Sequence, residues 1–511
     1  MGRLSKYIEQ NHKYMALLII ISGTLLRLLF IGSIPAGLNQ DEASAGYEAW
    51  ALLSYGMDRN GDAWPVLFTA WGSGQNVLYS YLSIPFIALF GLNEISLRLA
   101  MCISGSLSLL IFWLLAREIR GKAFGLWALL ILTLNPWHTM MSRWALESNL
   151  LPFMLLLGIY LLISAHKKPW LLTLSAAVFA LSLYAYGTAF IFLPFFLAAS
   201  SFIMLKRRII KLRVFITALV IFLLSALPIT LCNFLNIIGY GEVKILGITL
   251  PALTETRQSS VTSFGGGLDG LFNNFKTYMG ILAKQSDGLP WNSIKPYGLL
   301  YGPAGMILSA LGLSSYIVNL IKKRAHKNEI YVFIALISAL ISALFIDANI
   351  NRMNMSFIPL IWFQAAGISF IAEKIRQLAP VLVIAYLICG TLFTSYYFTD
   401  YPGVISPYFY EGLGEAISYA DKLEGDSLWL SYDINMPYIY VLFYTRYPAD
   451  KFVSTVEYLN PDGAFRWVSS FGDKYSFGHT PPEDSLCIIN ASYAENMEVL
   501  AVFGNYAVVK S

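Results

Sequence analysis

The chain has 511 residues and a formal net charge of +4, with 57% hydrophobic and only 13% charged residues. A soluble protein of this length carries about 25% charged residues, so the composition excludes a soluble globular protein. The basic residues form short clusters between apolar runs, which is typical of membrane anchors and not of a nucleic-acid surface. We therefore expect a multi-pass membrane protein with no nucleic-acid partner.

The basic clusters predict how the chain threads the membrane. If all of them are cytoplasmic, each neighbouring pair encloses an even number of crossings. Three apolar runs, 15–34, 77–91 and 95–115, separate the first two clusters, so one of them does not cross. The run 77–91 is the shortest, and we interpret it as a helix that lies on the membrane surface. About eleven spans remain, at 15–34, 95–115, 123–141, 149–165, 170–187, 188–205, 213–235, 297–320, 329–347, 356–373 and 379–397.

This topology predicts a cytoplasmic N-terminus and an extracytoplasmic C-terminus in a bacterial plasma membrane. Residues 1–397 form the transmembrane domain, with outer loops at about 35–94 and 236–296. Residues 398–511 are much less hydrophobic, and strand-like runs such as 427–432 and 485–490 indicate a small extracytoplasmic α/β domain. The predicted fold class is an all-α polytopic membrane protein with this domain appended.

Three acidic residues are expected at the outer surface. Asp41 and Glu42 follow the first span at the start of a helical stretch, and Glu147 follows the third. Transfer of a group to a hydroxyl needs a base to remove its proton, which a carboxylate can do. The alternatives are a helix cap for Asp41 and Glu42, and an intrahelical pair of Arg143 with Glu147.

Arg352 lies at the outer end of a predicted span, in the segment 347-DANINRMNMSFIPL-360. A guanidinium can hold a lipid-linked phosphate through two parallel hydrogen bonds. It can equally serve as an interfacial anchor, and the sequence leaves both roles open.

Taken in order, these segments resemble a known family. The first span, the Asp41–Glu42 pair, 56-GMDRNGDAWP-65, 134-LNPWHTMMSRWALESN-149 and the Arg352 segment resemble the GT-C fold glycosyltransferases that use phospholipid carriers. This is glycosyltransferase family 39, with the protein O-mannosyltransferases and the lipid A aminoarabinose transferases. The resemblance covers about residues 15–375. The Pro-Pro or His-Pro-Pro element of the family is absent from 72-GSGQNVLYSYL-82, which leaves the acceptor open.

The resemblance implies a mechanism and a set of partners. The donor would be a hexose or pentose on undecaprenyl phosphate, and Asp41 would deprotonate the acceptor hydroxyl, with inversion at the anomeric carbon. Glu42 and Glu147 would position the acceptor, tune Asp41 or bind a divalent cation. Arg352 and Arg143 would hold the donor phosphate. The acceptor would be a protein, a glycolipid or a cell-wall polymer.

Two other classes compete with this interpretation. A transporter or lipid flippase would place ionisable residues near the bilayer midplane, where the predicted spans hold Arg27 as the main exception. A polymerase or ligase would use a lipid diphosphate donor. Acidic residues at the outer boundary favour chemistry at that surface over passage through the membrane.

Overall fold

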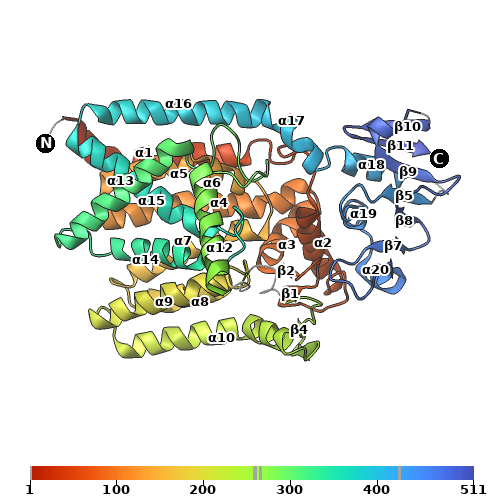
Figure 1. Ribbon diagram of the computed structural model, residues 1–511, viewed down its shortest axis with the longest axis horizontal. Coiled ribbons are helices and arrows are strands. Elements are labelled where there is room, and N and C mark those ends of the chain that lie inside the picture. Colours follow the sequence, from red (N-terminus) through yellow and green to blue (C-terminus); the bar gives the residue numbers. More distant parts are fainter. Residues whose placement is uncertain (1–2, 257–261, 264–266, 424–426, 496) are drawn as a thin grey trace.

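The computed structural model describes residues 3–256, 262–263, 267–423, 427–495 and 497–511. Long helices run side by side along the longest axis of the molecule, and a smaller domain with a sheet covers one end of this bundle (Figure 1). The N-terminus lies at the opposite end (Figure 1). The two-domain arrangement agrees with the fold class predicted from the sequence.

A helix occupies each position that was predicted as a span. Seven of the described helices are long and apolar enough to cross a membrane, namely α4 (Glu94–Arg120), α7 (Glu147–Ser164), α9 (Ala189–Lys206), α10 (Leu212–Ile237), α13 (Gly302–Ile321), α15 (Phe357–Lys374, extended by η1, Asn354–Ser356) and α16 (Leu378–Thr399). The other predicted spans are α1 (Arg3–Leu28), α5 (Lys122–Thr133), α8 (Leu171–Ser182) and α14 (Glu329–Ser342). The protein is thus a multi-pass membrane protein.

Helix α15 forms the centre of the bundle, and close contact with α13 holds it there. A Cβ on Gly312 would lie 1.9 Å from the backbone oxygen of Phe363, and one on Gly367 would lie 2.1 Å from that of Leu308. Small residues at such crossings let two helices approach closely, as membrane helices commonly do. The apolar window of α15 is 83% buried, whereas those of α10 and α16 are only 17% buried. The latter two helices therefore face lipid.

Two helices of the first outer loop lie between the bundle and the sheet domain (Figure 1). They are α2 (Gln40–Tyr55) and α3 (Leu78–Phe90), and between them run the short strands β1 (Leu67–Phe68) and β2 (Gln75–Asn76), which pair antiparallel. Helix α3 has only 13 residues and leaves Leu89 and Phe90 exposed. Helix α3 occupies the run 77–91, and its position at the membrane surface stays a prediction.

The C-terminal domain contains a seven-stranded sheet, as the strand-like runs predicted. Its strand order is β10-β11-β9-β5-β8-β7-β6, with β5 parallel to β8 and β9 and the other pairs antiparallel. The strands are β5 (Leu428–Ser431), β6 (Glu457–Tyr458), β7 (Val468–Phe471), β8 (Tyr475–Gly478), β9 (Leu486–Asn490), β10 (Glu498–Phe503) and β11 (Tyr506–Lys510). Helices α18 (Leu413–Ala420), α19 (Pro437–Thr445) and α20 (Ala449–Thr455) accompany them.

The C-terminal domain packs directly on the first outer loop. Helix α19 contacts α2, and a Cβ on Gly46 would lie 2.6 Å from the ring of Phe443. The hydroxyl of Tyr47 donates to the backbone oxygen of Tyr447 at 2.6 Å. The two segments share one hydrophobic core, so the C-terminal domain helps to fix the position of α2 and of the acidic residues at its start.

The remaining described elements connect these parts. They are α6 (Pro136–Met141), the hairpin β3 (Val243–Ile245) with β4 (Ile248–Leu250), the amphipathic helix α12 (Gly267–Lys284), α17 (Tyr401–Ile405), η2 (Ser406–Tyr408) and η3 (Ala491–Tyr493).

Candidate active site

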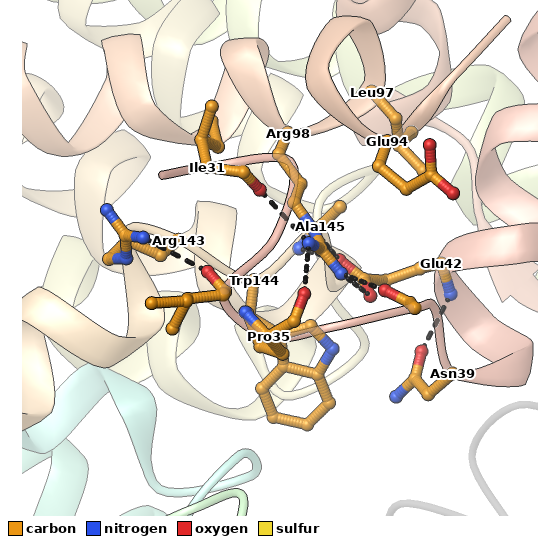
Figure 2. A network of polar contacts seen from close by, with 12 residues as sticks. Ile31, Pro35, Asn39, Glu42, Glu94, Leu97, Arg98, Arg143, Trp144 and Ala145 are labelled. Carbon is orange, nitrogen blue, oxygen red and sulfur yellow. Dashed lines mark hydrogen bonds and ion pairs between the residues drawn. The ribbon is translucent and has the colours of Figure 1, made fainter. Parts of the chain in front are cut away.

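Glu42 and Arg98 form a fully buried ion pair between the start of α2 and the first turns of α4. Arg98 donates from Nε to Glu42 Oε1 at 2.9 Å and from Nη2 to Oε2 at 2.8 Å (Figure 2). Its other N–H groups donate to the backbone oxygens of Ile31, Pro35 and Gly37 at 2.6–3.0 Å. All five donors of the guanidinium are thus used. Glu42 and Arg98 hold the segment after the first span against α4.

Glu42 also accepts a backbone hydrogen bond from Ala145 at 2.9 Å (Figure 2). The carboxylate therefore joins three separate parts of the chain, and its charge is compensated within the protein. A buried carboxylate in a bidentate pair is poorly placed to take a proton from a substrate. The geometry supports a structural role for Glu42 and gives no support to a catalytic one.

Asp41, the neighbour of Glu42, contacts a different set of groups. The indole N–H of Trp71 donates to Asp41 Oδ1 at 3.0 Å, and the side chain of Gln75 donates to the Asp41 backbone oxygen at 3.2 Å. Asn39 caps α2, because its side chain accepts from the backbone N–H of Glu42 at 2.9 Å. The cap does not need Asp41, which weakens the helix-cap interpretation of this residue.

Glu147 begins α7 and accepts a short hydrogen bond from the backbone N–H of Asn76. Asn76 follows Gln75 in β2, and Gln75 contacts Asp41. Asp41 and Glu147 thus contact neighbouring residues of β2, although more than a hundred residues separate them in the sequence. The sequence predicted that the two residues lie at one face of the membrane, and here β2 connects them through the Asp41 backbone oxygen and the Glu147 carboxylate.

Arg143 does not occupy the role that the sequence suggested. It is fully buried and donates to the backbone oxygens of Leu26, Arg27 and Ile34 at 2.9–3.0 Å and to the hydroxyl of Tyr397 at 3.2 Å. Arg143 therefore satisfies carbonyl groups at and beyond the C-terminal end of α1, which have no partner within the helix. Four of its five N–H donors are used, so the geometry favours a structural role for Arg143 over phosphate binding. Helix α7 begins only at Glu147, so the proposed intrahelical pair with Arg143 is wrong as well.

Arg352 lies on the turn between α14 and η1 and is partly exposed. Its Nη1 pairs with Asp347 Oδ2 at 2.7 Å, and the Asp347 side chain is 74% exposed. An exposed pair of this kind contributes about 0–1 kcal/mol, so the guanidinium can exchange Asp347 for another anion. Its backbone N–H donates to the side chain of Asn349, which borders a cavity of about 1080 Å³. That cavity is also lined by Lys276, Lys284 and Lys295.

Arg352 belongs to the same side of the molecule as Glu147. Two residues further on, the Asn354 side chain donates to the backbone oxygen of Ser148 at 3.0 Å and to the side chain of Asn149 at 3.2 Å. These two residues follow Glu147 in α7. These bonds anchor the segment that carries Arg352 beside Glu147.

Sequence reasoning missed several residues that build the site. Arg98 is the most important, and a signal for it existed, because a charged residue inside a predicted span usually has a specific role. Trp71 is another, and its indole donates to Asp41. Tyr438 of α19 lies edge-on to Trp71, with 6.4 Å between ring centroids, and no feature of the sequence pointed to this contact between domains.

A buried charge cluster supports the loop behind Asp41. Arg59 Nη1 pairs with Glu48 at 2.7 Å and donates to Ser44 at 2.7 Å. Its guanidinium lies over the ring of Trp71 at 5.0 Å, which is a favourable cation–π geometry. Burial, together with nearby Glu48, raises the pKa of Asp58 to about 7. Arg59 thus contacts both Trp71 and the buried acid Glu48.

Metal binding was left open by the sequence. Within the ranges that the structure describes, no three or more His, Cys, Asp or Glu side chains gather as a metal site would require.

Comparisons with known proteins address the family and the fold. Residues 75–231 match the family described as dolichyl-phosphate-mannose-protein mannosyltransferase. ArnT from Cupriavidus metallidurans bound to undecaprenyl phosphate has a TM-score of 0.56 at 12% identity, over 97% of each chain. Its apo state gives 0.53 at 13% identity, over 100% of this chain and 98% of that one. No curated protein matches the sequence.

A third structure shares the fold over part of its length. The Archaeoglobus fulgidus oligosaccharyltransferase in complex with Zn and sulfate has a TM-score of 0.50 at 13% identity, over 84% of this chain and 61% of that one. The chain therefore has the GT-C fold and resembles the O-mannosyltransferases and ArnT, as the sequence predicted.

Proposed function

We propose that this protein is a membrane glycosyltransferase that moves a sugar from a polyprenyl-phosphate carrier to an acceptor hydroxyl, with inversion and with Asp41 as the base. The GT-C fold, the partial family match and the undecaprenyl phosphate bound in the ArnT structure support the reaction class and the kind of carrier. The proposed site is the end of the bundle where α2 and α3 meet the C-terminal domain (Figure 1).

The different contacts of the two adjacent carboxylates, Glu42 and Asp41, carry this proposal. Glu42 is locked by Arg98 and Ala145, whereas Asp41 accepts from the indole of Trp71 and meets the strand that also contacts Glu147. In the proposed step, Asp41 takes the proton of the acceptor hydroxyl as its oxygen attacks the anomeric carbon. The bond from that carbon to the phosphate oxygen breaks, and the lipid phosphate leaves with the electron pair.

The leaving phosphate gains negative charge, which cations in fixed positions stabilise. Arg352 is the proposed partner, because its present pair with Asp347 is exposed and its segment is anchored beside Glu147. The lysines around the neighbouring cavity add positive charge to the same region. We propose that Glu147 orients the acceptor, and that a divalent cation, if the reaction uses one, binds between Asp41 and Glu147.

A transporter is the competing class, and the environment of Arg27 favours the enzyme. Arg27 is buried within the bundle, where it contacts His138 at 2.6 Å, Ser142 at 3.3 Å and the backbone of Gly23 at 2.8 Å. These contacts hold the charge in place inside packed protein, whereas transport sites line a path.

The test is sugar transfer by the purified protein in liposomes. Synthetic polyprenyl-phosphate sugars with labelled hexoses or pentoses are supplied, together with envelope extracts that contain protein, glycolipid and polymer acceptors. We expect transfer of label to a product of opposite anomeric configuration. Movement of the labelled lipid across the bilayer without transfer would instead identify a flippase.

A further inference from the structure

A second polar cavity lies at the opposite end of the bundle from Asp41. It has a volume of about 400 Å³, and the ends of α4, α13 and α15 and the starts of α5, α14 and α16 surround it. Helix α4 spans the distance between the two regions, from Glu94 to Arg120. At 1.5 Å per residue, the 22 residues from Arg98 to Arg120 place this cavity about 33 Å from the Glu42–Arg98 pair.

The charges that line this cavity are balanced, and half of them are already paired. Arg120 pairs with Glu329 at 3.6 Å, and Glu329 also accepts from the indole of Trp362 at 2.9 Å. Arg324 and Glu373 line the same cavity, and both are exposed to solvent. Glu373 accepts from Ser369 through Oε1 alone. The cavity therefore offers one cation and one carboxylate to a ligand that carries both charges.

A buried hydroxyl supports the presence of a ligand. Tyr316 lines the cavity and is only 3% exposed, yet its hydroxyl has no hydrogen-bond partner among the described residues. A buried polar group without a partner costs about 1–3 kcal/mol, so such groups usually meet a ligand or water. The hydroxyl oxygen is closed to solvent, so a phosphate oxygen in the cavity would accept its hydrogen bond only after the Tyr316 side chain moves.

The position of the cavity favours a lipid over a soluble ligand. Ala379 of α16 forms part of its wall, and α16 is one of the helices that face lipid. Basic residues surround this end of the bundle (Lys322, Lys323, Lys327, Lys374 and Arg376), which is the pattern of the cytoplasmic membrane boundary.

We propose that this cavity binds a phospholipid headgroup that carries both a phosphate and a primary ammonium, as phosphatidylethanolamine does. Arg324 and the Tyr316 hydroxyl hold the phosphate, and Glu373 accepts from the ammonium. A quaternary ammonium cannot donate a hydrogen bond to Glu373, and a headgroup without an amine leaves Glu373 beside a phosphate. The site therefore selects against phosphatidylcholine and phosphatidylglycerol.

Lipid binding to the detergent-purified full-length protein tests this proposal. Native mass spectrometry would measure the affinities for phosphatidylethanolamine, phosphatidylglycerol and phosphatidylcholine, while inorganic phosphate and glycerophosphoethanolamine separate a headgroup effect from a lipid effect. We expect the phosphatidylethanolamine complex to be at least fivefold tighter than the other two lipids, a factor equal to about 1 kcal/mol. Equal affinity for the three lipids, or tighter binding of inorganic phosphate than of any lipid, would overturn the proposal.

Variants of the exposed lining residues locate the site. Arg324→Gln should weaken binding of phosphatidylethanolamine about fivefold, and Glu373→Gln should abolish its advantage over phosphatidylglycerol. Arg213→Gln is the matched control, because Arg213 is an exposed arginine near the same end, at the start of α10, and does not line the cavity. An equal effect of Arg213→Gln and Arg324→Gln would show a general charge effect and contradict the proposed site.

Tyr316→Phe separates ligand binding from packing. If the hydroxyl contacts the lipid, its removal lowers the affinity while the thermal stability of lipid-free protein stays equal or rises. A rise in stability with no change in affinity would remove Tyr316 from the proposed site.

Discussion

The indole N–H of Trp71 donates a hydrogen bond to Asp41 Oδ1 at 3.0 Å, and Trp71 is itself placed between Arg59 and Tyr438. Arg59 comes from the first outer loop and Tyr438 from helix α19 of the C-terminal domain. The orientation of the proposed base therefore depends on contacts from both domains. The C-terminal domain therefore contributes a residue, Tyr438, that helps to position the site.

Asp41→Asn should abolish most of the transfer activity. Asparagine keeps the size of the side chain and can still accept from Trp71, but it has no basic carboxylate oxygen. Positioned proton transfer contributes roughly 10²–10⁴-fold, and we expect a loss of that size in the rate of transfer from polyprenyl-phosphate sugar. The melting temperature should change little. Full activity of Asp41→Asn would remove Asp41 as the base.

Glu42→Gln should act in a different way, through stability. It leaves the buried guanidinium of Arg98 without its counter-charge, and breaking a buried pair costs about 3–5 kcal/mol of folding free energy. We expect poor yield or a clearly lower melting temperature in thermal unfolding followed by fluorescence. A well-folded Glu42→Gln protein that lacks activity would instead assign Glu42 to the chemistry.

Trp71→Phe should lower turnover without unfolding the protein. Phenylalanine keeps most of the ring contacts with Arg59 and Tyr438 but cannot donate to Asp41. Hydrogen bonds to charged groups contribute about 1.5–3 kcal/mol, so we expect roughly 10- to 100-fold slower transfer at saturating donor. Trp64→Phe is the matched control, because Trp64 is 44% exposed and packs against Tyr81. Equal activity of the two variants would show that the bond to Asp41 is not needed.

The sequence predicted the helices far better than the polar contacts between them. Long apolar runs are local signals, and a helix occupies each position that they predicted, as a sheet occupies the C-terminal domain. Asp41 and Glu147 were singled out for the same reason, because each adjoins a predicted span. The bond from Arg98 to Glu42 joins residues 56 positions apart, and only side-chain geometry shows that Arg98 pairs with Glu42 while Trp71 donates to Asp41. Arg143 was predicted to hold phosphate, whereas most of its partners here are backbone carbonyls, which give no signal in the sequence.

The buried acids behind the site predict a dependence of stability on pH. The pKa of Asp58 is raised from 3.8 to about 7, first by burial and then by Glu48. The folded protein therefore holds a proton that the unfolded chain loses, and stability falls as the pH rises from about 4 to about 7. Asp58→Asn keeps the acceptor for the backbone N–H groups of Asn60 and Asp62. Its melting temperature should exceed that of the wild type more at pH 8 than at pH 5.

The control for that measurement is Asp473→Asn, since Asp473 is exposed in the C-terminal domain. Its melting temperature should follow the wild type at both pH values. A constant offset between Asp58→Asn and the wild type from pH 5 to pH 8 would contradict a shifted titration of Asp58.

Arg352→Lys tests the proposed donor phosphate site. Lysine keeps the charge but loses the fork of two N–H donors that matches a phosphate. We expect weaker use of the polyprenyl-phosphate donor, seen as a rise of about tenfold in the KM for donor, or an equal fall in kcat/KM. Arg352→Gln removes the charge as well and should lower kcat further, because the leaving phosphate then lacks a cation. The protein should stay folded in both cases, since the pair with Asp347 is largely exposed.

The matched control for Arg352 is Lys244→Gln. Lys244 is 59% exposed in the hairpin of the second outer loop, where it pairs with Glu242 at 3.0 Å. It tests whether any loss of positive charge on this face weakens the attraction of an anionic lipid, an effect that salt would screen. If Arg352 acts by contact, its variants remain impaired at high salt while Lys244→Gln matches the wild type. Equal, salt-sensitive losses of activity at both positions would indicate that Arg352 is an interfacial anchor. The lysines around the neighbouring cavity would then be the next residues to substitute.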